Sequence, residues 1–168
     1  MAVLPILTWP DARLSQLCPP AAPGDDGLRQ LAADMLDTMY AAPGRGLAAP
    51  QVGVLTRLFV MDVTWKEGIM APLVCLNPQI LWRSDTLLAG PEGCLSIPGL
   101  SLEIVRAAEI DLAWTDLEGT PQHRRMTGFE AICAQHELDH LDGIVTFDRL
   151  TADARLDATG RYAAGMAQ

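Results

Sequence analysis

The sequence HELDH, residues 136–140, combines residue types and spacing that suit metal chemistry. If the segment is helical, four residues advance about 400°, so His136 and His140 lie on one face and can share a metal ion. Glu137 then lies about 100° around the helix, where it reaches a water on the metal rather than the metal itself. An ordinary charged helix surface is the alternative. Because two of the chain's three histidines fall in this pattern, we favour a metal site.

A catalytic tetrahedral site needs a third protein ligand, so that the fourth position stays open for water. The remaining histidine, His123, precedes the motif, whereas the usual third ligand of HExxH enzymes follows it. Cys94, in the sequence EGCLS, is one candidate. A cysteine is also often a buried apolar residue, which is how we interpret Cys18 and Cys75. Spacing alone therefore does not select Cys94.

The sequence GRGLAAPQ, residues 44–51, is the third unusual stretch. Its two glycines flank one residue and allow another group to approach the backbone closely. A turn after a helix would explain the glycines equally well. Gln51, at its end, is either a hydrogen-bond donor at a site or a surface amide.

The elements that must position these residues begin with a helix. Apolar residues recurring three and four apart predict a helix that starts at Asp25 or Asp26 and ends before Pro43. Short segments rich in Val, Ile, Leu or Trp then predict strands. A turn at 116–119 leads to a return strand. The predicted strands are 57–63, 73–76, 79–82, 109–115 and 123–126.

A second helix is predicted from about Gly128 to Asp142, and it carries the HExxH residues. Thr127 and Glu130 have the spacing of a capping box at its start, and Gly143 suits the position after its end. One helix, several antiparallel strands and a further helix predict the α+β class.

Composition excludes several classes of protein. The 168 residues suit one domain, and 49% hydrophobic residues with 20% charged residues exclude intrinsic disorder. No apolar run is long enough to span a bilayer. Twelve scattered basic residues against 21 acidic ones give a net charge of −9, so we expect no direct nucleic-acid binding. The N-terminus shows no signal peptide, and we expect a cytoplasmic protein whose four cysteines are free thiols.

GRGLAAPQ, EGCLS and QHELDHLDG, in this order, resemble the three signature motifs of the peptide deformylase family. The resemblance covers about residues 6–150, including ILTWPDARL near the start and TFDRL after the last motif. It implies that residues 1–168 form a single catalytic domain with a short C-terminal tail at 151–168. The implied fold is a compact α+β domain in which antiparallel β-sheets surround a central HExxH helix, with another helix near the N-terminus.

The resemblance assigns Cys94, His136 and His140 as metal ligands, with water completing the tetrahedron. The family's metal is typically Fe(II), and Zn, Ni or Co can substitute. Metal-bound water attacks the formyl carbon of N-formylmethionyl peptides, Glu137 acts as general acid/base, and formate is released.

The resemblance also assigns the groups that surround the substrate. The Gln51 side chain and the backbone N–H of Leu95 stabilise the oxyanion. The peptide binds as an extended strand, with its methionine side chain in an apolar slot. The implied substrate-binding residues are Arg45, Gly46, Gly93, Ile132 and Cys133.

Three positions depart from the family's usual pattern or depend on partners elsewhere. Arg45 stands where the family usually has Ile; its stem can line the slot with the guanidinium in water, or it can pair with an acidic group of a different substrate. Ser101 falls where several bacterial members carry an arginine that holds the substrate backbone. Arg106 matches a structural arginine that we expect to pair with a carboxylate such as Glu92.

The expected substrates are nascent chains in a bacterial-type cytoplasm. Some family members dock on the ribosome through a long basic C-terminal helix, but the tail here is short and not basic, so we expect no such docking. The alternatives are a deformylase-like paralogue with shifted substrate choice, a non-catalytic metal-binding protein and a generic HExxH protease. The presence of Glu137 and Gln51 argues against a non-catalytic protein.

Overall fold

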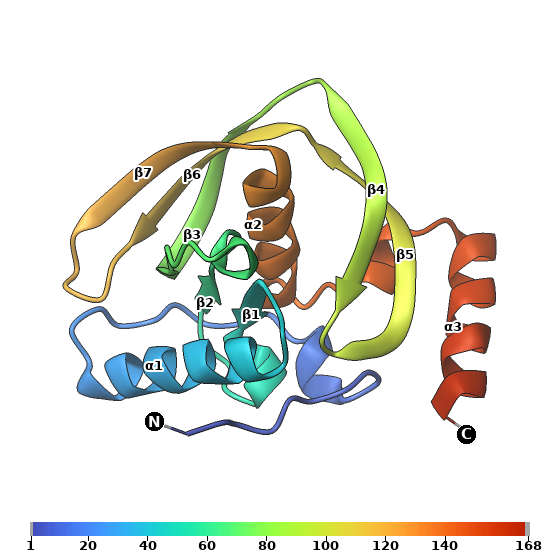
Figure 1. Cartoon of the computed structure of the whole chain (residues 1–168), viewed down its shortest axis with the longest axis horizontal. Coiled ribbons are helices and arrows are strands. Elements are labelled where there is room, and N and C mark those ends of the chain that lie inside the picture. Colours follow the sequence, from blue (N-terminus) through green and yellow to red (C-terminus); the bar gives the residue numbers. More distant parts are fainter. Residues whose placement is uncertain (1, 167–168) are drawn as a thin grey trace.

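The computed structural model describes residues 2–166 and confirms the α+β class. The described part of the chain contains three α-helices and seven β-strands, joined by short 3₁₀ turns (Figure 1). The helices are α1 (Asp26–Ala41), α2 (Gly128–Leu141) and α3 (Ala152–Met166). The strands are β1 (Gly46–Ala48), β2 (Leu58–Met61), β3 (Leu73–Arg83), β4 (Leu87–Cys94), β5 (Ile97–Ala107), β6 (Glu109–Thr115) and β7 (Pro121–Thr127).

The strands form two antiparallel sheets. Five strands pair in the order β1-β2-β3-β6-β7, and β4 pairs with β5 as a separate two-stranded ribbon. Helix α2 stands in the centre, with the larger sheet on one side and the β4–β5 ribbon on the other (Figure 1). Strand β1 ends the larger sheet, so one of its edges is left without a partner strand among residues 2–166. That edge faces the space beside α2.

Burial on both sides makes α2 almost entirely inaccessible. Residues 133–141 are all buried, including two histidines, a glutamate and an aspartate. Gln135 fastens the helix to the end of β5, because its amide exchanges two hydrogen bonds with the backbone of Ala107. At the C-terminal end of α2, Arg57 donates hydrogen bonds to the carbonyl of Leu141 and to the carboxylate of Asp142. The helix that carries the HExxH motif is therefore fixed at several points.

Helix α1 begins where the sequence predicts. Asp25 is its N-cap, and the side chain accepts a hydrogen bond from the N–H of Gly27. The apolar stripe faces inward and packs on the larger sheet beside β1 and β2. The helix ends at Ala41. The residues that follow it, 44–46, lie next to α2.

The predicted capping box of α2 is wrong. Thr127 is extended and its side chain makes no capping hydrogen bond, while Glu130 pairs with Arg124 instead. Gly128 has a φ of +57°, which turns the chain sharply from β7 into the helix. At the other end the prediction holds, since Gly143 follows the helix with a φ of +74°.

Two further differences concern strands. The segments 73–76 and 79–82 are one strand, β3, whose pairing with β6 shifts register between Leu76 and Gln79. The sequence analysis also missed β1 and the β4–β5 ribbon. The ribbon contains glycines and prolines, which weaken strand signals, but proline is tolerated at strand edges and each ribbon strand pairs on one side only.

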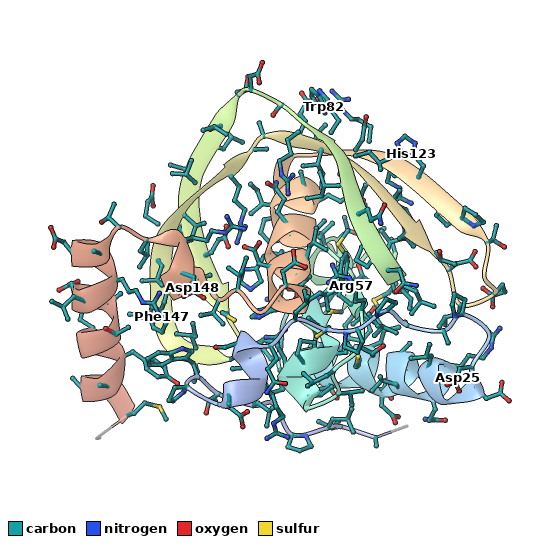
Figure 2. The ribbon with its side chains drawn as sticks, turned by 180° about the vertical axis from the view of Figure 1, so that it is seen from behind. Asp25, Arg57, Trp82, His123, Phe147 and Asp148 are labelled. Carbon is teal, nitrogen blue, oxygen red and sulfur yellow. The ribbon has the colours of Figure 1, made fainter. Side chains whose placement is uncertain are left out.

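The C-terminal tail contains a helix that the sequence analysis did not predict. Tyr162 of α3 is buried against Trp9 and Phe147, and its hydroxyl donates to the carbonyl oxygen of Trp9 over 2.9 Å. Figure 2 shows Phe147 between α3 and the body of the domain. Within residues 2–166, no helix has both the length and the apolar character needed to cross a bilayer. The four cysteines are unpaired, and Cys18 and Cys75 are buried, as predicted.

Candidate metal centre

The structure brings together three side chains that could hold a metal ion: Cys94, His136 and His140. Their donor atoms all lie within 4.8 Å of one another, and Cys94 Sγ is 3.4 Å from His140 Nε2. The histidines come from adjacent turns of α2. Cys94 is the last residue of β4, and a two-residue turn after it connects β4 to β5. A thiolate with two imidazoles is a donor set that suits Zn and the late first-row divalent ions.

His136 is oriented by a carboxylate. Its Nδ1 lies 2.9 Å from Glu92 Oε1. This contact leaves Nε2 as the free ring nitrogen, which is the arrangement seen around metal-bound histidines. His140 contributes Nε2 to the cluster, while its buried Nδ1 has no hydrogen-bond partner in the described residues. His136 is thus set for ligation by Glu92, and the convergence of its ring with His140 and Cys94 supports the fit of a metal ion.

A chain of alternating charges extends from Glu92 away from the cluster. Arg106 donates to both oxygens of Glu92, over 2.6 and 2.9 Å, and confirms the expected pair. Arg106 also pairs with Asp139 of α2, and Asp139 in turn pairs with Arg149 beyond the helix. Burial alone would raise the pKa of Glu92, but hydrogen bonds from His136 and Arg106 outweigh it and hold the pKa below its usual value. Glu92 therefore stays a carboxylate.

Glu137 points into the same space as the three potential ligands but does not belong to their cluster. Only 4% of the residue is exposed, and Oε2 has no hydrogen-bond partner in the described residues. Burial raises the pKa of this carboxyl to about 7. A general acid/base requires a carboxylate like this one, which is buried, unpaired and beside the cluster of Cys94, His136 and His140.

Gly46 provides the room that Glu137 occupies. A Cβ at Gly46 would lie 2.8 Å from Glu137 Cδ and 2.9 Å from Cys133 Sγ, and it would overlap with Glu137 Oε1. Contacts this short do not occur with real side chains, so any other residue at this position would displace Glu137 or Cys133. The second glycine of GRGLAAPQ is thus explained by close approach of β1 to α2.

Gln51 is a buried residue that lines the cavity, and not a surface amide. It is 1% exposed, and its Oε1 accepts a hydrogen bond from the N–H of Ala48 over 2.9 Å. This contact turns the amide nitrogen toward the cluster. Nε2 donates to Ser96 Oγ over 3.1 Å and lies 3.8 Å from Cys94 Sγ. Gln51 therefore presents a donor beside the potential metal ligands.

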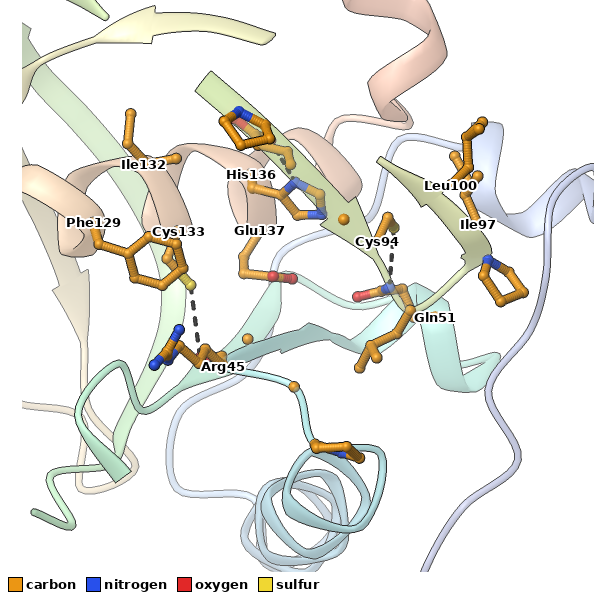
Figure 3. Close-up of a pocket in the computed structure, with 18 of the residues that line it drawn as sticks. Arg45, Gln51, Cys94, Ile97, Leu100, Phe129, Ile132, Cys133, His136 and Glu137 are labelled. Atoms are coloured by element: carbon orange, nitrogen blue, oxygen red, sulfur yellow. Dashed lines mark hydrogen bonds and ion pairs between the residues drawn. The ribbon is translucent and has the colours of Figure 1, made fainter. Parts of the chain in front are cut away.

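Most of the potential ligands and their neighbours line one cavity of about 440 Å³ (Figure 3). Cys94 and Gln51 lie on one side, Phe129 and Ile132 on the other, and His136 and Glu137 point between them. His140 lies outside the lining, at the back of the cluster. His123 is exposed on β7 and points away from α2 (Figure 2). Each predicted substrate-binding residue lines the cavity: Arg45, Gly46, Gly93, Ile132 and Cys133.

Arg45 has partners that the sequence analysis did not foresee. Its Nη2 pairs with Glu67 Oε1 over 2.6 Å, and its guanidinium carbon lies 5.2 Å from the ring centroid of Phe129. Arg45 lines the cavity, but its head group is engaged with these two residues and does not lie free in water as one interpretation held. No local pattern could have indicated Glu67 or Phe129, since both come from distant segments.

Comparison with known proteins gives one consistent family. The family model described as Polypeptide deformylase matches residues 3–155. The chain is 50% identical to the peptide deformylase of Alkalilimnicola ehrlichii over 151 residues, covering 90% of this chain and 84% of the relative. A peptide deformylase structure from Legionella pneumophila matches with a TM-score of 0.91 and 37% identity, covering 98% of this chain and 96% of the other. The structure of the Ehrlichia chaffeensis enzyme in complex with actinonin also gives 0.91, at 38% identity and 98% coverage of both chains.

Proposed function

This chain belongs to the polypeptide deformylase family, and on that premise we propose how its own residues perform the family's reaction. The activity is hydrolysis of the N-formyl group of N-formylmethionyl peptides, which releases formate and a free α-amine. The observation that carries the residue assignment is the convergence of Cys94, His136 and His140 beside the buried carboxylate of Glu137.

Cys94, His136 and His140 would hold the ion. We propose Fe(II), with Zn, Ni or Co as substitutes, because thiolate and imidazole donors suit these ions. When bound, a divalent ion lowers the pKa of a water and polarises the formyl carbonyl. Glu92 keeps the His136 ring in place through the contact at Nδ1.

Glu137 is proposed as the proton carrier. It receives the proton of the attacking water and transfers it to the leaving nitrogen as the C–N bond breaks. Its position supports this role, since the carboxylate is buried, lines the cavity and has a free oxygen. Gly46 permits that position, because any side chain there would occupy the space that the carboxylate now fills.

The charge that develops on the formyl oxygen needs preorganised donors. We assign Gln51 Nε2 to this task, since the hydrogen bond from Ala48 fixes which end of the amide faces the cavity. The backbone N–H of Leu95, next to Cys94 in the ribbon turn, is proposed as the second donor. One such donor is worth about 3 kcal/mol of transition-state stabilisation.

The peptide is proposed to bind as an added strand. The open edge of β1 at Gly46 and the outer surface of the ribbon at Gly93 both border the cavity. No atom would contact a Cβ at Gly93, so the ribbon leaves space for a backbone there. The methionine side chain then enters the slot beside Ile132 and Cys133, which suits an unbranched thioether.

The cellular setting is also a proposal. We place the protein in a bacterial-type cytoplasm, acting on nascent chains without direct binding of nucleic acid. Helix α3 supports the absence of ribosome docking through a basic helix, because its two arginines each pair with an aspartate: Arg155 with Asp148, and Arg161 with Asp157.

The test is formate release from formyl-Met-Ala-Ser by the protein loaded anaerobically with Fe(II), or with Ni(II) in parallel. Glu137→Gln is the matched variant, and the metal content of both proteins is measured. We expect release by the wild type and loss of release in a variant that still carries metal. A folded, metal-loaded wild type that releases no formate would refute the proposal.

A further inference from the structure

The structure leaves two basic side chains without a carboxylate partner in residues 2–166, and one of them borders the cavity. Every arginine except Arg83 is paired with an acidic residue. Lys66, the only lysine, makes no ion pair in that range, and it lines the same cavity as the potential metal ligands. In a chain of net charge −9, an unpaired cation at this place is unexpected.

The turn that carries Lys66 is anchored to the cavity wall on both sides. Before it, Trp65 Nε1 donates to the carbonyl oxygen of Gly44 over 2.8 Å, and its ring packs edge-on against Tyr40. After it, Glu67 pairs with Arg45. The lysine is thus held beside residues 44–45. Its side chain is exposed, and its ammonium nitrogen lies 5.7 Å from the centroid of the Trp65 ring, on the anchored turn.

Arg45 adds a second positive group to the same rim. Its Nε is buried and has no hydrogen-bond partner in the described residues, so the pair with Glu67 does not use all of its donors. The two carboxylates that line the cavity lie elsewhere: Glu92 is neutralised by Arg106, and Glu137 faces the metal-type cluster. Glu67 offsets the charge of Arg45, so the rim formed by Arg45, Lys66 and Glu67 keeps one net positive charge, that of Lys66.

An extended peptide would bring its later residues to this rim. If its formyl end lies at the metal-type cluster and its first residue pairs with the β1 edge at Gly46, the chain beyond passes Arg45 and Gly44. Because Trp65 bonds the carbonyl of Gly44, the turn that carries Lys66 adjoins this path. At about 3.3 Å for each extended residue, we expect the second or third residue to lie there.

We propose that Lys66, supported by Arg45, recognises a carboxylate on the second or third residue of the formylated peptide. The inference rests on the proposed deformylase function and specifies its substrates: formylmethionyl peptides with Asp or Glu soon after the methionine are preferred over neutral ones. The positive rim acts locally against the overall negative charge, which by itself would repel acidic peptides.

The experiment measures kcat/KM for formyl-Met-Asp-Ser-amide and compares it with the value for formyl-Met-Asn-Ser-amide. A second pair of peptides, with Asp or Asn at the third position, is compared in the same way. Amidated ends remove the terminal carboxylate, and Asn matches Asp in shape. We expect an Asp/Asn ratio of about two to five at low ionic strength in at least one pair, carried by KM and reduced by salt.

Three variants locate the effect. Lys66→Gln should lower the ratio to one or below, whereas Arg83→Gln, which removes the other unpaired cation, should leave the ratio unchanged. Glu67→Gln releases Arg45 from its partner and should raise the ratio. The inference would be overturned if the wild-type Asp/Asn ratio were one or less in both pairs. It would also be overturned if Lys66→Gln left the wild-type ratio unchanged. Turnover of the Asn peptides would leave the deformylase assignment intact in that case, and only absence of all formate release would count against it.

Discussion

Oε1 of Glu92 lies 2.9 Å from Nδ1 of His136, while both oxygens of the same carboxylate accept hydrogen bonds from Arg106. One buried side chain thus orients a proposed metal ligand and neutralises a buried guanidinium. Its two roles belong to different properties of the enzyme, metal affinity and stability, and both can be measured.

Glu92→Gln should lower both quantities. Loss of the carboxylate weakens the support of His136, and changes of this kind cost about 10- to 100-fold in metal affinity. Arg106 loses one of its two buried partners, and breaking a buried ion pair costs about 3 kcal/mol of unfolding free energy. Denaturant unfolding and metal titration measure these effects.

The control is Glu109→Gln, which breaks the exposed pair with Arg125 and should change stability by less than about 1 kcal/mol. Equal behaviour of the two variants would show that the Glu92 carboxylate has no special role.

Gly46→Ala should impair catalysis while leaving metal binding largely intact. The added Cβ overlaps with the Glu137 carboxylate and with Cys133 Sγ, so the carboxylate must move. A displacement of about 1 Å near the chemistry can cost about 100-fold in rate. Steady-state formate release measures kcat, and metal content is measured on the same samples.

Gly90→Ala serves as the control, since a Cβ there meets no atom within 4 Å. If Gly46→Ala kept kcat within threefold of the wild type, the close approach of β1 to Glu137 would not matter for catalysis.

Gln51→Ala should lower kcat by about 100- to 1,000-fold if its amide stabilises the oxyanion. The loss should appear in kcat more than in KM, because the donor acts on charge that forms only during the reaction. Gln79→Ala, at an exposed position of β3, is the matched control and should behave as the wild type. A drop confined to KM would assign Gln51 to substrate binding instead.

Removal of the metal should lower thermal stability. An ion that binds only the folded state stabilises it by about 4 kcal/mol when its concentration is 1,000 times Kd. For a chain of this length that corresponds to about 10 °C in Tm. Calorimetric scans with and without chelator should show this shift in the wild type and in Glu137→Gln.

His140→Ala removes a proposed ligand and should abolish the dependence of Tm on metal. An unchanged wild-type Tm after verified removal of the ion would contradict the assignment of the cluster.

The sequence predicted the parts of the site that lie close together along the chain. His136, Glu137 and His140 are related by helix geometry alone, so the common face of the histidines and the place of Glu137 beside it could be deduced from spacing. Cys94 joins them only through the packing of the ribbon on α2, and its choice depended on family resemblance. The same holds for Gln51, whose burial results from the turn after β1.

Other features could not be read from local patterns for physical reasons. The β4–β5 ribbon contains residues that ordinarily break strands, and it is stable because it covers α2. Arg45 was ambiguous because its partners, Glu67 and Phe129, lie far along the chain. The capping box failed because Gly128, with its positive φ, already supplies the turn into the helix.

The run of alternating charges from His136 through Glu92, Arg106 and Asp139 ends at Arg149, after α2 and before α3. A minimal catalytic fragment must therefore include Arg149 if it is to keep this network. A chain shortened to the end of the HExxH helix would keep every residue that lines the cavity, yet Asp139 would lose its second arginine. The charge network that supports His136 therefore extends several residues beyond the last potential ligand.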